Sequence, residues 1–214
     1  MTGKSLKEQN RRKVASWAAL LLFLFVYVVI LGMPDANGLK QLLEQWKDWF
    51  GLVAGATGMA MVVWMLDGLI PRALKEVLVH WRLHDRAPGH RAFSVYALTD
   101  SRFQPEQLKG KLGDFPATPA DQNTIWYQLS KKHGDNPRVF DAHKSYLASR
   151  EMTSITVVMG LPLAALGFLV ANSTVLAWIF LGAVVAVYLL MSFTAHRFAI
   201  EFVKNVLALE ASAD

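Results

Sequence analysis

Residues 152–195 read MTSITVVMGLPLAALGFLVANSTVLAWIFLGAVVAVYLLMSFTA, a stretch of 44 residues without a charged side chain. A helix crosses the hydrocarbon core of a bilayer with about 20 apolar residues. The stretch divides at Asn172 and Ser173 into segments of 20 and 22 residues, Met152 to Ala171 and Thr174 to Ala195. We therefore expect two membrane-spanning helices joined by a two-residue turn.

Two more segments of this kind lie nearer the N-terminus, at Val14 to Met33 and Phe50 to Ile70. Asp67 is the only charged residue in any of the four segments, and 53% of all 214 residues are apolar. Four such helices, apolar on every side, would not fit inside one short soluble domain. The sequence predicts an all-α membrane protein with four transmembrane helices and a small, mainly helical cytoplasmic cap between helices two and three.

The distribution of basic residues predicts the orientation. Of 22 Lys and Arg residues, five precede the first predicted helix, thirteen lie between the second and third, and two follow the fourth. Lys and Arg collect on the cytoplasmic side near helix ends. Placing both termini and the central segment in the cytoplasm puts 20 of the 22 there, which indicates a multi-pass protein of the cytoplasmic (inner) membrane.

The predicted organisation follows from these segments. It consists of a basic cytoplasmic tail at 1–13, a transmembrane hairpin at 14–71 with an outer interfacial helix at 38–49, a cytoplasmic cap at 72–151, a second hairpin at 152–195 and a cytoplasmic C-terminal helix at 196–214.

Within the cap, apolar periodicity and breaker residues predict the elements. We expect an amphipathic helix at 72–83, a strand or helical turn at 92–98, a loop-rich region at 100–119, a helix capped by Asp121 and ending at His133, and a long helix that Asn136 caps and Pro137 opens. Apolar residues at helical spacing after residue 195 predict that the C-terminal segment packs against the cap, namely Phe198, Phe202, Val206 and Leu209.

Small residues recur at four-residue spacing in the predicted spans. Such spacing lets helix backbones approach closely in lipid, either within one chain or between copies. The candidate packing positions are Gly51, Gly55, Gly58, Gly160 and Gly182. They predict close helix packing and a homo-oligomer.

Asp67 lies within about one turn of the predicted cytoplasmic end of its helix, five residues before Arg72. Intramembrane carboxylates are costly and often functional. Snorkelling to the membrane surface, or an ion pair with Arg72 or with a basic group of a neighbouring chain, is the favoured interpretation. A ring of Asp67 carboxylates at the inner mouth of an oligomeric pore is the alternative.

Metal and cofactor chemistry is not indicated. His80 and His84 have the one-turn spacing of two ligands, but Trp81 stands where a zinc-protease motif needs Glu, and no third ligand is defined. The chain has no cysteine, which excludes thiolate sites and disulfides. Phosphate-loop, kinase and nucleophile-elbow motifs are also missing from the sequence, so no cofactor, no metal and no enzymatic activity are expected.

The cap is rich in aromatic residues, and an excess of them could form a docking surface for a protein partner. The candidates are Trp81, Trp126, Tyr127, Lys131 and Lys132. Residues 72–151 carry 13 basic and 9 acidic residues, a charge that suits anionic lipid headgroups. No nucleic-acid-binding motif accompanies it, so no specific nucleic acid is expected.

In its helix plan the chain resembles the small four-transmembrane components of bacterial anti-phage defence systems. That resemblance implies a membrane bundle that recruits partners or compromises the membrane, and it assigns no functional residue. We expect a non-enzymatic, oligomeric inner-membrane protein whose cap binds a partner protein or a signal. A ligand-gated channel or pore-forming effector is the alternative, and a metal-dependent membrane enzyme is a more distant one.

Overall fold

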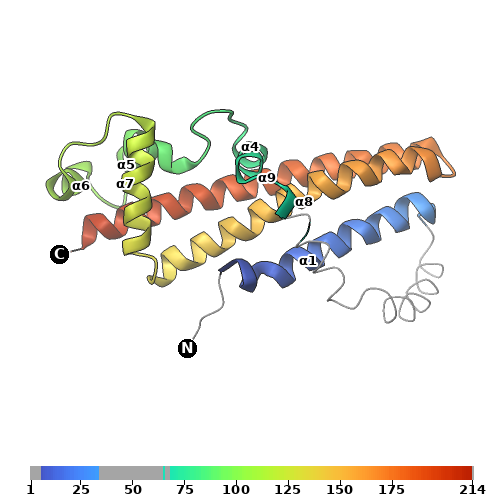
Figure 1. The fold of residues 1–214 in the computed structure, drawn as a ribbon, viewed down its shortest axis with the longest axis horizontal. Helices are drawn as coiled ribbons and strands as arrows, with labels where there is room; N and C mark the ends of the chain where they lie inside the picture. The colour runs from blue at the N-terminus through green and yellow to red at the C-terminus, as the bar shows by residue number, and fades with distance from the viewer. Residues whose placement is uncertain (1–5, 34–64, 66–67, 214) are drawn as a thin grey trace. The chain divides into compact units, whose positions relative to one another are not determined.

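The computed structural model describes residues 6–33, 65 and 68–213, and these residues form helices and connecting turns without a strand (Figure 1). In the numbering of Figure 1, the elements are α1 (Leu6–Phe25), the π-helix η1 (Val26–Ile30), α4 (Arg72–His80), the 3-10 helix η2 (Pro88–Arg91), the π-helix η3 (Ala92–Tyr96), α5 (Ala97–Thr99), α6 (Pro105–Leu112), α7 (Pro119–Lys132), α8 (Pro137–Val170) and α9 (Thr174–Ser212).

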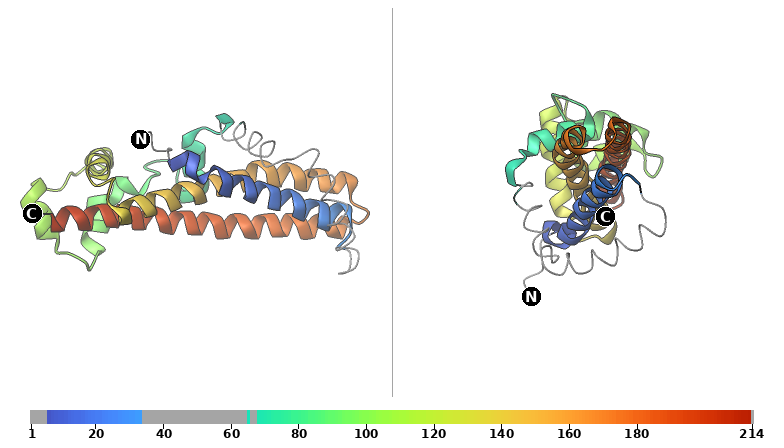
Figure 2. Two further views of the ribbon diagram at one scale, coloured as in Figure 1. Left: turned by 90° about the horizontal axis from the view of Figure 1, so that it is seen from below. Right: turned by 90° about the vertical axis from the view of Figure 1, so that its right-hand side faces the viewer.

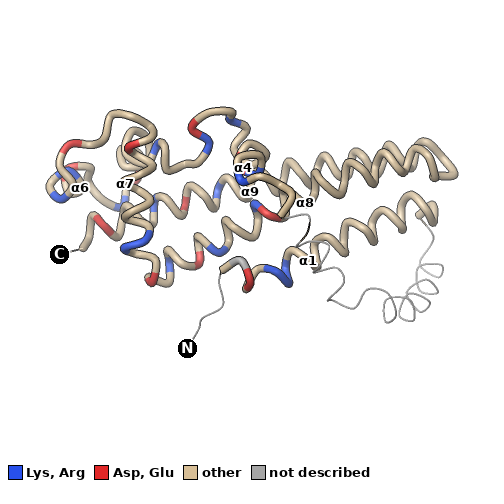
Figure 3. Tube along the Cα trace, in the orientation of Figure 1, with Lys and Arg blue, Asp and Glu red and all other residues tan. Residues whose placement is uncertain are grey.

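Among the described residues, three helical stretches are long and apolar enough to cross a membrane: Glu8–Ile30, Pro137–Val170 and Thr174–Ser212. Charged residues are missing from long parts of α1, α8 and α9 (Figure 3). This confirms the predicted helical class in the described residues, and the three stretches support three of the four predicted spans by their length and composition. The predicted span at 50–70 and the outer helix at 38–49 fall almost wholly outside the described residues.

The chain divides into two compact units, to which α8 and α9 both contribute. The apolar unit combines the described residues up to Pro71 with Glu151–Met191, and the polar unit combines Arg72–Arg150 with the described residues from Ser192 onward.

In the apolar unit, α1 packs on the antiparallel pair formed by α8 and α9 (Figure 2). Phe25 is the last residue of α1, and its ring packs edge-to-face on Phe180 of α9 with centroids 5.3 Å apart. Near the middle of α1, the indole N–H of Trp17 donates to Thr156 Oγ1 at 3.0 Å. This bond satisfies both polar groups inside an otherwise apolar contact.

The polar unit has its own apolar core, built around the last third of α9. Val203, Val206 and Leu207 of α9 are fully buried among Phe93, Leu108 and Val139. Figure 1 shows α7 lying across this part of α9. This core includes residues of five short elements and of both long helices. The polar unit is therefore folded around a core of its own and is not a linker.

Buried polar side chains fix the short elements in place. The Gln122 side chain of α7 is buried, and its Oε1 accepts from the backbone N–H groups of Phe93 and Ser94 at 3.2 and 3.1 Å. These N–H groups begin a helical turn and have no partner within it. Arg102 similarly joins Asp100, at 2.7 Å, to Asn205 of α9, also at 2.7 Å.

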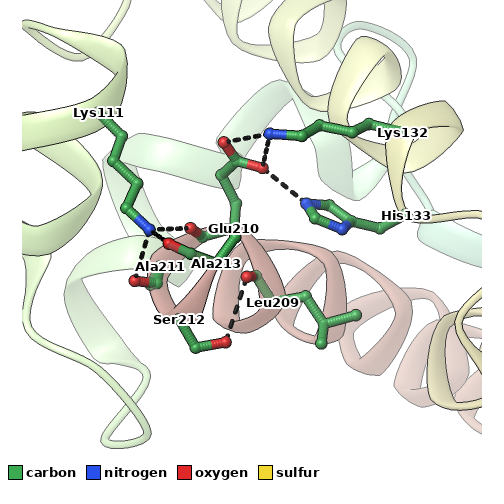
Figure 4. Close-up of polar contacts among 8 residues, drawn as sticks. All are labelled: Lys111, Lys132, His133, Leu209, Glu210, Ala211, Ser212 and Ala213. Atoms are coloured by element: carbon green, nitrogen blue, oxygen red, sulfur yellow. Dashed lines mark hydrogen bonds and ion pairs between the residues drawn. The ribbon is translucent and has the colours of Figure 1, made fainter.

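A lysine and a carboxylate hold α6 and α7 to the end of α9 (Figure 4). Lys111 Nζ donates to the carbonyl oxygens of Glu210 and Ala211 at 3.0 and 3.1 Å, and also to that of Ala213. Glu210 in turn accepts from Lys132 at 2.9 Å and contacts His133 Nε2 at 2.6 Å. The last carbonyls of a helix lack intrahelical partners and attract cations, so Lys111 completes α9.

The C-terminal prediction is confirmed, because Phe202 and Val206 are buried and Phe198 and Leu209 pack against the same core. The start of α8 is also as predicted: Asn136 Oδ1 accepts from the Arg138 N–H at 3.0 Å, and Pro137 is the first helical residue. The segment 92–98 is helical, which decides between the two alternatives.

Four local predictions were wrong. The segment 6–13 is part of α1 rather than a tail, because it contains no breaker and Glu8 favours a helix N-terminus. The helix expected at 72–83 ends at His80, where Trp81 adopts a left-handed φ of 52°. The region 100–119 contains α6, and Thr118 rather than Asp121 caps α7.

Candidate functional site

The candidate site is centred on His80, the last residue of α4, which is buried in the polar unit. Its Nδ1 lies 2.9 Å from Nδ1 of His196 on α9, and its Nε2 lies 3.4 Å from the hydroxyl of Tyr146 on α8. The left-handed turn at Trp81 ends α4 directly after His80, so the ring lies at the helix end. One side chain thus joins three elements.

The two histidines are restricted in where they carry protons. Two Nδ1 atoms at 2.9 Å leave room for one hydrogen between them, so one ring donates and the other accepts. A second proton in that gap would bring two N–H groups face to face. The short contact therefore excludes two charged rings, and burial favours the neutral pair because it lowers the pKa of both His80 and His196.

The positive charges of three arginines act on this pair. The pKa of His80 is lowered to about 3, first by burial, then by His196 and by the positive charges of Arg91, Arg150 and Arg82. Arg150 Cζ lies 5.6 Å from the ring centroid of Tyr146, and Arg91 Cζ lies 5.9 Å from that of Tyr96. We call His80, Arg82, Arg91, Tyr146, Arg150 and His196 the arginine–histidine cluster; all six belong to the polar unit.

Arg91 contributes an unusual feature to the cluster. Its Nε and Nη2 atoms are buried, and neither has a hydrogen-bond partner among the described residues. Buried donors without an acceptor cost about 1–3 kcal/mol each, so they are rare in folded proteins. Burial also raises the pKa of the Tyr96 hydroxyl, against the opposing effect of Arg91 and Arg82.

The buried histidine predicts a pH dependence of stability. The folded chain holds His80 neutral down to about pH 3, whereas the unfolded chain takes up that proton near pH 6.5. Stability therefore falls as the pH drops below 6.5, by about 2 kcal/mol at pH 5 from this residue. Thermal unfolding of the protein in lipid nanodiscs at pH 7.5 and pH 5 measures the difference.

His80→Gln should reduce this pH dependence, because it removes the most strongly shifted histidine; the remainder belongs to His143 and His196, whose pKa values burial also lowers. His84→Gln is the matched control: His84 is exposed and four residues away, so the variant should behave as wild type. An identical pH response in wild type and His80→Gln would contradict the buried neutral assignment.

The structure separates the five residues predicted to form a docking surface. Trp81 and Tyr127 are exposed, at 64% and 50%, and Lys131 Nζ lies 4.6 Å from the Tyr127 ring centroid. Trp126 instead packs edge-to-face on Phe202 at 5.1 Å, and Lys132 is bound to Glu210. Trp126 and Lys132 therefore hold the polar unit together.

The predicted helix-packing glycines differ in how much space surrounds them. A Cβ atom on Gly160 would lie 2.7 Å from Val184 Cγ1, so Gly160 marks a close approach of α8 and α9 in the same chain. A Cβ atom on Gly182 would meet nothing within 4 Å. Gly51, Gly55 and Gly58 lie outside the described residues.

The predicted ion pair of Asp67 is not tested, because Asp67 lies outside the described residues. Arg72 Nε donates to Glu76 Oε1 at 2.8 Å, one turn further along α4. Among the described residues, no group of three or more His, Asp or Glu side chains is placed to hold a metal ion.

Sequence analysis considered His80 only as a metal ligand and rejected that role, and it missed the rest of the cluster. His196 follows the last predicted span directly, and Arg150 comes two residues before the third. The available signal was the polar residues at the end of one predicted span and the start of the other, because adjoining ends of two antiparallel spans meet at one membrane surface.

Comparison with known proteins finds no family model, no curated protein and no solved structure that matches this chain.

Proposed function

We propose that the chain is a non-enzymatic, oligomeric protein of the inner membrane whose polar unit lies in the cytoplasm and binds a signal or a protein partner. Four membrane-spanning helices anchor it in this proposal, with residues 50–70 supplying the fourth. The charge distribution of the sequence supports this orientation, because it puts 20 of 22 basic residues in the cytoplasm.

The observation that carries the proposal is the position of His80 between the two long helices. Its contacts reach Tyr146 on α8 and His196 on α9, within one or two turns of the apolar stretches that begin at Met152 and end at Ala195. A ligand that binds at the arginine–histidine cluster therefore acts on both helices at once. This suits a protein that passes a binding event to its membrane helices, and a sensor or anchor in a defence system is one such protein.

Self-association is supported by the outer face of α9. Trp178 and Phe193 are 63% and 62% exposed, and Gly182 has open space above its Cα. In lipid, small residues with nothing packed on them allow a second helix to approach. Gly160 is already used within the chain, which leaves the face around Gly182 for another copy.

Counting the copies per complex tests this proposal. The protein is extracted in native lipid and its mass is measured; wild type should contain two or more copies, and Gly182→Leu should contain fewer. Gly110→Leu is the control, since Gly110 also has open space above it but lies on α6 in the polar unit. A monomeric wild type would contradict the oligomer, and steady ion flux through liposomes would instead favour the channel alternative.

A further inference from the structure

We propose that α4 is an interfacial helix whose outer face contacts the inner leaflet of the membrane through Leu74, Leu78 and Trp81. We call these three side chains the α4 stripe. The inference rests on the proposed function, because it takes the polar unit to lie on the cytoplasmic side, and it adds a surface and the partner of that surface. The partner is a lipid layer, made of anionic headgroups and the acyl chains directly below them.

The first argument is the position of α4 along α9. The Ser192 hydroxyl donates to the carbonyl oxygens of Leu78 and Val79 at 3.0 and 3.1 Å, and His80 Nδ1 lies 2.9 Å from His196 Nδ1. Ser192 comes three residues before the apolar stretch of α9 ends, and His196 follows that end directly. A helix rises about 1.5 Å per residue, so both contacts lie within about 5 Å of the end of the stretch. In the proposed topology, this is the depth at which headgroups meet acyl chains.

The second argument is the distribution of side chains around α4. Leu74 and Trp81 are 45% and 64% exposed, and Leu78 between them is partly exposed. Lys75 is only 4% exposed, and Val79 is buried as well. Residues three and four apart share a helix face, so the α4 stripe forms one face, and Lys75 and Val79 belong to another. A helix that faces water buries leucine in preference to lysine, whereas an outer face of leucine and tryptophan suits a lipid surface.

The third argument is the chemistry at the two ends of the stripe. Arg72 begins α4, and 78% of its side chain is exposed although its Nε bonds Glu76 at 2.8 Å. Arg82 follows Trp81 and is exposed, and Leu83 after it is 69% exposed. Basic side chains near a membrane surface attract anionic headgroups, and tryptophan is favoured at the same depth. Apolar residues flanked by arginines are therefore the composition expected of a segment that lies on an anionic membrane.

The small size of the stripe favours lipid over a second protein. Stable protein–protein interfaces bury about 800 Å² on each partner, from roughly 20–30 residues a side. The α4 stripe offers three apolar side chains on a helix of nine residues and the residue that follows it. A lipid layer needs no matching surface and surrounds the protein at this depth. A membrane surface is therefore the partner that this face fits.

The test measures what surrounds a fluorescent label on the stripe. The chain has no cysteine, so Leu74→Cys carries a single bimane label in the full-length protein, which is held in nanodiscs of phosphatidylcholine and phosphatidylglycerol. Lipid with a nitroxide near its headgroup should quench most of the fluorescence of this label, and iodide in the water should quench little of it.

Leu98→Cys is the matched control, because Leu98 is a leucine of α5 that is 57% exposed. Close to it in the chain, Arg102 Nη1 donates to Asn205 Oδ1 at 2.7 Å, and Asn205 lies ten residues beyond the apolar stretch of α9. The label on Leu98→Cys should therefore show the opposite pattern, with strong quenching by iodide and weak quenching by the lipid nitroxide. Leu83→Cys repeats the measurement after the C-terminal end of α4 if Leu74→Cys does not fold.

A second arm uses a substitution whose effect changes sign with the surroundings. Leu74 is the third residue of α4, where a glutamate stabilises a helix that faces water. On an anionic membrane, Leu74→Glu loses an apolar contact and brings a negative charge to the headgroups. Amide hydrogen exchange in α4 should therefore be faster in this variant than in wild type, and Leu98→Glu should leave it unchanged.

The proposal is overturned if the stripe label is quenched like the label on Leu98→Cys, which would place α4 in water. It is also overturned if neither quencher reaches the stripe label, because protein would then cover this face, or if exchange in Leu74→Glu is equal to wild type or slower. The copies per nanodisc, counted by mass, test the proposed function separately. An intact oligomer with a water-exposed stripe contradicts the membrane contact of α4 alone.

Discussion

Gly89→Val should destabilise the polar unit by about 3 kcal/mol, at the upper end of the cost of overpacking. A Cβ atom at Gly89 would lie 2.5 Å from both Asn123 Oδ1 and Trp126 Cε3. Both residues belong to α7, and Trp126 also packs on Phe202 of α9. The indole cannot move away from a valine without losing that contact, so η2 and α7 must separate.

Denaturant unfolding followed by tryptophan fluorescence, together with limited proteolysis of the segment 72–150, measures the change. Gly110→Ala is the matched control, because a Cβ atom there meets nothing within 4 Å and alanine is the better helix former inside α6. This control should be as stable as wild type or slightly more stable. Equal stability of Gly89→Val and wild type would contradict the packing of η2 on α7.

Gly160→Leu should have a similarly large effect in the apolar unit, about 3 kcal/mol or more, since a branched side chain has no room between the helices. The Cβ atom alone would lie 2.7 Å from Val184 Cγ1. In lipid, helices associate through close packing rather than through the hydrophobic effect. A larger side chain between two closely packed helices therefore lowers the stability of the bundle. Thermal unfolding in nanodiscs should show a lower midpoint.

A compensating pair makes this second test specific. Gly160→Ala should destabilise the protein by a smaller amount, and adding Val184→Ala should recover part of the loss, because it removes the two methyl groups that the new Cβ meets. Additive effects of Gly160→Ala and Val184→Ala would show that the two residues do not touch.

Long-range features of the fold followed from simple patterns. The apolar stretches predicted α8 and α9 because lipid leaves a spanning segment few choices besides a helix. The start of α8 was predictable as well, since Asn136 and Pro137 each have one favoured role at a helix N-terminus. The stripe from Phe198 to Leu209 predicted that α9 continues into the polar unit.

The errors came from breaker residues that end helices rather than form loops. Pro105 is the first residue of α6, and Gly113 follows its last with a φ of 79°, so the two breakers enclose a helix of eight residues. Thr118 precedes Pro119 in the same way, and its hydroxyl bonds Asp121, the residue we had expected as the cap. A short helix between two breakers has too few residues to show a periodic pattern.

The candidate site was less accessible to sequence reasoning than the fold. His80 and His196 are 116 residues apart, and Arg91 stands in a turn without periodicity. These residues come together only because of how α4 packs against α8 and α9, and no local sequence pattern predicts that packing. The burial of Trp126 and the pairing of Lys132 with Glu210 are missed for the same reason.

Membrane topology is the most direct test of the account, because every proposal here requires the polar unit to lie in the cytoplasm. The chain has no cysteine, so single cysteines introduced at Ser101 and Ser173, both exposed, can be labelled without background. A membrane-impermeant maleimide should label Ser173→Cys in intact cells and Ser101→Cys only after the membrane is permeabilised. Labelling of Ser101→Cys in intact cells, with Ser173→Cys protected, would contradict the account.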